Sequence, residues 1–218
     1  MTVTIDPVIE REGPRRRPPD FFPAYDEATF NRHLQVMEPE VVDPVSGKMF
    51  ISYQTFVVGT PRHTILVDTC ILIPVRTGED KGHPASFDFL GKERWRNELF
   101  ALGVNYESID YVICTHLHID HTGWNTTLRN GRRVPTFPNA KYVFHKREYA
   151  AWEAENARGA NPPGTVFRDS CRPIVEAGQA LLVDDDYALD DTITLTPTPV
   201  TRPAIAASIS SRMASGRW

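Results

Sequence analysis

Hydrophobic and polar residues alternate along this chain in short stretches that turn-forming residues separate. Stretches rich in β-branched and aromatic residues predict strands at Met49–Val58, His63–Asp68, Asp110–Thr115, Lys141–Phe144, Gln179–Val183 and Thr192–Thr196. Two stretches predict helices: Lys146–Glu155, and Lys92–Leu102, where Trp95, Leu99 and Leu102 share one face and Gly103 can end the helix. Short strands alternating with helices are typical of a layered α/β or α+β domain.

The segments between these elements differ in character. Thr60–Arg62 reads as a turn, so the first two strands form a hairpin, and Arg76–Leu90 is polar and reads as a long loop. Residues 1–45 are rich in proline and weakly periodic, which predicts an irregular N-terminal arm ahead of a domain at residues 46–199. We expect this arm to wrap the domain, and a dimer contact or a pocket wall is the alternative. Its anchors would be four aromatic residues: Phe21, Phe22, Tyr25 and Phe30.

Composition limits the classes of function. The chain has 218 residues, enough for one good-sized core, and its net charge of −4 argues against nucleic acid as a partner. No stretch is apolar enough to span a membrane or to serve as a signal peptide, so we expect a cytoplasmic protein without membrane contact. Three widely spaced cysteines indicate unpaired thiols in a reducing compartment.

Four residues of types that bind metals fall within six positions directly after one predicted strand. The segment Thr115–Asn125 reads THLHIDHTGWN and contains His116, His118, Asp120 and His121. Imidazole and carboxylate groups bind zinc and similar cations. A single histidine is usually structural, but four such groups so close together favour a metal site. The histidines at 116 and 118 can project to one side, with the other two donors at a second position. Two metals about 3.5–4 Å apart would then share a hydroxide nucleophile.

Other candidate residues favour structural roles. We expect His145 to be structural, and His33, His63 and His83 to be surface residues. The run Asp184–Asp186 lacks the spacing of a calcium loop and reads as a charged turn. Two residues next to the cluster either line a pocket or pack beneath the loop: Trp124 and Asn125.

The motif THLHIDHTG resembles the metal-binding signature of the metallo-β-lactamase fold superfamily. HTILVDTC resembles its earlier strand and turn, in which a glycine usually stands where Cys70 stands here. The stretch from Lys92 to Asn125 is similar to bacterial lactonases and methyl-parathion-type hydrolases, and the whole resemblance runs from about Met49 to about Pro199. It implies an αββα sandwich with a dinuclear metal site at one edge.

The resemblance also implies roles for residues. His116 and His118 would bind the first divalent metal, and Asp120 and His121 the second; zinc is the expected metal, with manganese, iron and cobalt as alternatives. Asp120 would also help to hold the attacking hydroxide, and Asp68 would orient the metal loop. The implied function is a hydrolase that acts on an ester, lactone or related bond of a small molecule. A glyoxalase-type thioesterase, an inactive fragment and a non-catalytic module are the alternatives, and a homodimer is a candidate assembly.

The sequence departs from the family after Pro199. Superfamily members carry further histidine and aspartate ligands, the first within a segment resembling PTPGHTPGH. Here Thr196–Pro199 reads TPTP and then continues VTRPAIAASISSRMASGRW, and no His, Asp, Glu or Cys follows Asp191. Codons for Gly-His-Thr-Pro-Gly-His, when read one base later, permit Val-Thr-Arg-Pro-Ala-Ile, the order of residues 200–205. We therefore interpret residues 200–218 as an out-of-frame tail.

This interpretation has physical consequences. Only the N-terminal half of the sandwich would be present, with two side-chain ligands for each metal, where zinc sites ordinarily use three or four. We expect weak or partial metal binding and little or no hydrolysis by this chain. A sheet without its second half would also expose backbone edges and apolar faces, which favours aggregation.

Overall fold

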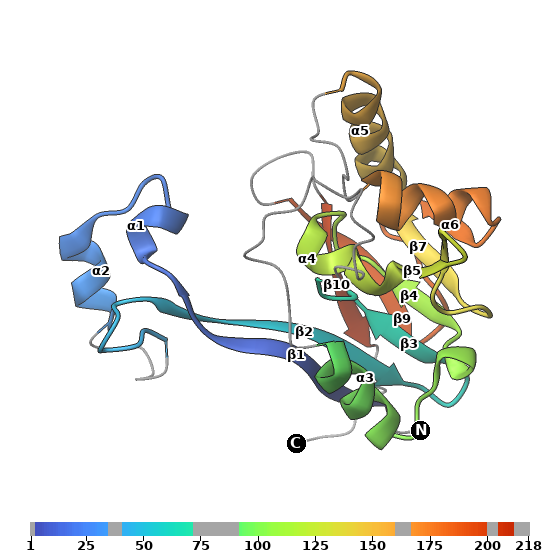
Figure 1. Cartoon of the computed structure of the whole chain (residues 1–218), viewed down its shortest axis with the longest axis horizontal. Coiled ribbons are helices and arrows are strands. Elements are labelled where there is room, and N and C mark those ends of the chain that lie inside the picture. Colours follow the sequence, from blue (N-terminus) through green and yellow to red (C-terminus); the bar gives the residue numbers. More distant parts are fainter. Residues whose placement is uncertain (1–2, 35–40, 72–91, 160–166, 200–204, 212–218) are drawn as a thin grey trace.

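A computed structural model describes residues 3–34, 41–71, 92–159, 167–199 and 205–211 (Figure 1). Its centre is a six-stranded sheet in the order β1-β2-β3-β4-β7-β8. Strands β1, β2 and β3 pair antiparallel, and β3, β4, β7 and β8 pair parallel. The bounds are β1 Thr4–Arg16, β2 Met49–Gly59, β3 Thr64–Val67, β4 Tyr111–Ile113, β7 Lys141–His145 and β8 Ala180–Val183. The carboxyl ends of the parallel strands therefore meet at one edge of the sheet.

Two smaller sheets and several helices complete the described structure. The small sheets pair β5 (Thr126–Arg129) with β6 (Arg132–Pro135), and β9 (Ile193–Pro199) with β10 (Ile205–Ser211). The helices are α1 Pro18–Phe21, α2 Glu27–Leu34, α3 Lys92–Ala101, α4 Ile119–Thr122, α5 Lys146–Ala157 and α6 Arg172–Glu176. Short turns of other helix types are η2 Tyr106–Ser108, η3 Gly123–Asn125 and the π-helical η4 Phe167–Cys171. Among the described residues, no helix has the length and apolarity needed to cross a membrane.

The two faces of the central sheet bury different partners, because neighbouring residues of a strand point to opposite faces. On one face, Leu66 and Val112 belong to a core that includes Trp95 of α3 and Ile174 of α6. A second core lies on the other face and is formed by Val58, Ile65, Val67, Ile113, Val143, Val183, Ile193 and Leu195. The expectation of an uncovered sheet was therefore wrong for these residues, since β9 packs on this face. The mixed α/β layering that the sequence predicts is confirmed.

The predicted elements agree closely with the observed ones. Each of the six predicted strands exists with ends shifted by a few residues, and the hairpin of β2 and β3 is confirmed. Helix α3 ends at Ala101, and Gly103 follows with a φ of 77°. Because the helix ends there, Leu102 is 44% exposed, and its expected place on the buried face was wrong. The predicted loop Arg76–Leu90 and the surface histidine His83 lie outside the described residues.

The N-terminal segment differs most from its prediction. Residues Thr4–Arg16 form a long edge strand paired with β2, so an irregular structure was wrong for this stretch. Prolines at positions 7 and 14 suggested irregularity, but an edge strand tolerates proline because one of its sides needs no ladder hydrogen bond. Beyond this strand, α1 and α2 lie at the far end of the β1–β2 ribbon, away from the domain (Figure 1).

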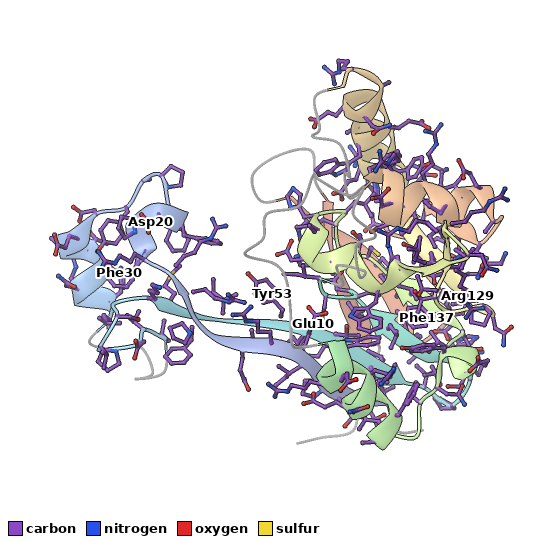
Figure 2. All side chains as sticks on the ribbon, viewed as in Figure 1. Glu10, Asp20, Phe30, Tyr53, Arg129 and Phe137 are labelled. Carbon is purple, nitrogen blue, oxygen red and sulfur yellow. The ribbon has the colours of Figure 1, made fainter. Side chains whose placement is uncertain are left out.

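The tip of the arm does not use its aromatic residues as anchors on the domain. Phe21 and Phe22 pack against each other with ring centroids 5.1 Å apart, and each remains about half exposed. Tyr25 and Phe30 also contact each other, with tilted rings whose centroids are 5.5 Å apart. Figure 2 shows Phe30 and Asp20 together at this tip. The wrap expected of these four residues was therefore wrong, whereas the homodimer stays a prediction.

Trp95 gives the clearest test of the core. Its side chain is fully buried, stacks on Trp124 with centroids 4.4 Å apart, and donates a hydrogen bond to Thr55 Oγ1. Replacing Trp95 with alanine should lower the free energy of unfolding by about 3–5 kcal/mol, the usual range for a buried aromatic residue. Urea titration followed by circular dichroism measures this change. Phe100→Ala on the same helix is the control, since Phe100 is 45% exposed; an equal loss from both variants would refute the assignment of the core.

Candidate metal centre

The histidine cluster lies at the edge where the parallel strands end. Strand β4 ends at Ile113, and the chain passes through Thr115 into a loop that closes with the short helix α4. His118 is the residue before α4, and its carbonyl accepts hydrogen bonds from His121 N at 3.1 Å and Thr122 Oγ1 at 3.1 Å. This single turn brings the later donors of the motif back toward the earlier ones.

Three of the four predicted ligands come together. One ligand atom from each of His116, Asp120 and His121 lies within 4.8 Å of the others. The rings of His116 and His121 have centroids 3.7 Å apart, and His121 Nε2 is 3.4 Å from Asp120 Oδ2. His118 is not in this group; its ring stands perpendicular to that of His116 at 4.7 Å. The division of the four ligands between two metals stays a prediction.

Asp68 holds the cluster in place from the end of β3. Its Oδ2 lies 2.7 Å from His121 Nδ1, and its Oδ1 accepts a hydrogen bond from Thr115 N at 2.8 Å. A carboxylate at Nδ1 places the proton on that nitrogen and leaves Nε2, on the side of Asp120, as the nitrogen for a ligand. The orienting role that the resemblance implied for Asp68 therefore agrees with its contacts.

The turn after β3 also grips the loop through its backbone. Thr69 N donates to His121 O at 2.8 Å, and Trp124 N donates in return to Thr69 O at 2.9 Å. Cys70 holds a φ of 50°, a left-handed conformation that favours glycine, and its carbonyl accepts from Gly123 N at 2.8 Å. Trp124 and Asn125 are buried, which favours the reading that they pack beneath the loop.

The charges of the cluster are those of a site that a cation can enter. Burial, and then the neighbouring His121 and His118, lower the pKa of His116 to about 4, so its ring is neutral at pH 7. Burial also disfavours the charged form of His121, but hydrogen bonds to Asp120 and Asp68 outweigh it and raise its pKa to about 9. The ring of His121 is therefore protonated at pH 7 and lies between the carboxylates of Asp68 and Asp120.

This donor set fits a divalent metal. A cation that displaces the proton of His121 would meet two imidazole nitrogens and a carboxylate oxygen. Three protein ligands with one open position is the usual arrangement of catalytic zinc. The cysteines do not belong to the set: Cys70, Cys114 and Cys171 are buried and unpaired, as expected, and burial raises the pKa of each thiol.

Two of the remaining histidines, His145 and His63, have structural partners. His145 accepts a hydrogen bond from Arg147 N and lies 3.1 Å from Asp185, which confirms its structural role. Asp185 also pairs with Arg147, in agreement with a charged turn. The side chain of His63 is 24% exposed, so this residue lies at the surface as expected, and it lies 3.1 Å from Asp190.

Three residues that contact this region were not predicted: Glu10, Glu148 and Trp152. Glu148 and Trp152 lie one turn apart on α5, which begins at the sheet edge that carries the metal loop because β7 runs parallel to β4. The sequence could have indicated this, because the predicted helix at Lys146 directly follows a predicted strand that pairs with the strand before the histidines. Glu10 gave none, because β1 was not predicted as a strand.

A family model described as the metallo-beta-lactamase superfamily matches residues 49–203, more than half of the chain. The chain belongs to this superfamily. The match begins where β2 begins and contains the entire loop that carries the histidines.

Similar proteins agree with this membership. A 49-residue segment is 39% identical to the N-acyl homoserine lactonase AttM of Azorhizobium caulinodans, covering 22% of this chain and 15% of that protein. Among solved structures, a probable metal-dependent hydrolase from Staphylococcus aureus has a TM-score of 0.71 at 14% identity. AidC, a dizinc quorum-quenching lactonase, has a TM-score of 0.64 at 18% identity. This chain is covered to 96% in both comparisons, but those chains only to 69% and 68%. At such identities the structures support the fold alone.

Proposed function

We propose that the protein is a metal-dependent hydrolase by descent, whose form with a complete ligand set opens the ring of a lactone, with N-acyl homoserine lactones as the substrate class. The observation that carries the proposal is the convergence of His116, Asp120 and His121 within 4.8 Å, braced by Asp68. The lactone class rests on the resemblance to lactonases, on the name of AttM, an N-acyl homoserine lactonase, and on AidC, a lactonase in complex with a product, an N-acyl-L-homoserine. Water would add to the lactone carbonyl, the ring C–O bond would break, and a hydroxy acid would leave.

The residues of the site have separate tasks in this proposal. His116, Asp120 and His121 would hold a divalent metal, with zinc expected, and the bound metal would acidify water and polarise the carbonyl. Asp68 keeps the ring of His121 in one orientation, so the ring loses little conformational freedom when the cation binds. Burial disfavours the ionised form of Asp120, but the hydrogen bond to His121, the charge of that ring and further contacts together outweigh burial and lower the pKa of Asp120. Asp120 is therefore ionised and can accept a proton from the attacking water.

Zinc titration and substrate assays test this proposal. Purified, metal-free chain should bind zinc, with a rise in melting temperature that grows with zinc concentration, because binding to the folded state adds RT ln(1 + [L]/Kd) of stability. Any hydrolysis of N-hexanoyl homoserine lactone should require zinc and exceed hydrolysis of a glutathione thioester. Faster thioester hydrolysis would favour the glyoxalase-type alternative, and a melting temperature unaffected by zinc would refute the metal site.

A further inference from the structure

Two buried glutamates contact the metal loop from opposite parts of the sequence. The metal loop comprises residues His116–Trp124. Glu10 of β1 is 5% exposed and Glu148 of α5 is 3% exposed. Burying a carboxylate is costly unless hydrogen bonds compensate it, and each of these two accepts one backbone N–H and one indole N–H.

Glu10 joins the end of the metal loop to the turn after β3. Its Oε1 accepts from Trp124 Nε1 at 2.8 Å, and its Oε2 accepts from Ile71 N at 2.9 Å. Trp124 is the last residue of the loop, and Ile71 follows the turn that grips it. Figure 2 shows Glu10 where the β1–β2 ribbon meets the domain. One carboxylate thus ties two segments 53 residues apart in the sequence, from Ile71 to Trp124.

Glu148 holds the beginning of the loop. Its Oε1 accepts from Leu117 N at 2.8 Å and from Trp152 Nε1 at 3.3 Å. Leu117 stands between His116 and His118, so this bond fixes the backbone that carries both imidazoles. The Trp152 ring in turn lies perpendicular to the His118 ring at 5.5 Å.

We infer that Glu10 and Glu148 are positioning residues that fix the two ends of the metal loop, so that its donors stand ready for a cation. The inference rests on the proposed function for its consequence, since the loop matters because it binds metal. Side-chain ligands held by a rigid surrounding bind metal more tightly than the same ligands on a mobile loop. The two glutamates supply that rigidity from β1 and from α5, outside the loop itself.

Amide hydrogen exchange of the metal-free protein, measured by NMR, tests the contacts directly. Glu10→Gln leaves one acceptor oxygen for two donors, so the Ile71 amide or the Trp124 indole should exchange at least about tenfold faster, as expected for a buried donor without its acceptor. Leu117 should exchange fastest in Glu148→Ala and more slowly in Glu148→Gln, because glutamine keeps an acceptor oxygen. Val143 of the central strand β7 should change little in every variant.

Exposed glutamates on the same elements are the controls. Glu12→Gln on β1 and Glu153→Gln on α5 should leave exchange in the loop unchanged, since both side chains face solvent. If Glu148→Ala does not fold, Trp152→Phe removes the indole N–H but keeps an aromatic ring, and it should loosen His118, as the His118 ring proton shifts would report. Unchanged exchange in Glu10→Gln and in the Glu148 variants would overturn the inference, and so would unchanged exchange in Glu10→Gln together with unchanged His118 ring proton shifts in Trp152→Phe.

Zinc titration of the same variants tests the consequence. Glu10→Gln and Glu148→Ala should weaken zinc binding by about 10–100-fold, the usual cost of losing a supporting contact, while Glu12→Gln and Glu153→Gln should bind like the parent. If the parent protein binds no zinc, the proposed function fails, and the exchange data alone decide the positioning roles. If the parent binds zinc and the Glu10 and Glu148 variants bind it equally well, the inference fails and the proposed function stands.

Discussion

Replacing His121 with alanine should weaken zinc binding by more than about 100-fold, since losing only a supporting partner of a ligand typically costs about 10–100-fold. His121 is the ligand with the most support: Asp68 holds its Nδ1, and its Nε2 lies beside Asp120. Without it, His116 and Asp120 remain as two donors, too few for a usual zinc site. Competition against a chromophoric zinc chelator measures the affinity.

Two further variants make this result specific. Asp68→Asn should give an intermediate loss, about 10–100-fold, because the ring of His121 remains but its orientation is no longer fixed by a carboxylate. His33→Ala should bind zinc like the parent, since His33 is an exposed residue of α2. Parental affinity in His121→Ala would show that the cation binds elsewhere, and the donor set proposed here would be wrong.

Most strands of the central sheet could be predicted because each is a short run of apolar, β-branched or aromatic residues that can be recognised without knowing its neighbours. Strand β4 and the motif after it are recognisable because apolar, β-branched residues lead directly into the histidines. Strand β1 was missed because its prolines mark irregular structure in most contexts, and only its position at the sheet edge makes them acceptable. The covering of the second face by β9 depends on tertiary packing, which no local pattern reports.

The site shows the same limit. His116, Asp120 and His121 were identified because all three lie within six consecutive residues. Glu10 lies 114 residues from Trp124, and Glu148 lies 31 residues from Leu117, so their contacts exist only once the sheet has formed. Asp68, 53 residues before His121, was identified only through the family resemblance.

If residues 200–218 are an out-of-frame tail, restoring the reading frame after Pro199 should change this protein more than any substitution. We expect the corrected protein to bind two metals and to open lactones with a turnover of about 1–1000 per second, the range of ordinary enzymes, while the present chain stays near background. The reason is ligand number: the described residues bring three donor atoms together, and no ligand-type residue follows Asp191. A dinuclear site needs more donors than that.

The structure of the tail does not argue against this hypothesis. Residues Ile205–Ser211 pair with β9 as β10 in a regular antiparallel register, but such pairing is made by backbone groups, which any sequence of suitable propensity supplies. Side-chain ligands are different, because only the right residue types can donate to a metal. Sequencing the DNA beyond the Pro199 codon is the first measurement, followed by zinc stoichiometry and lactone turnover of the corrected protein. A neighbouring frame that does not encode Gly-His-Thr-Pro-Gly-His would end the hypothesis, and so would strong binding of two zinc ions by the present chain.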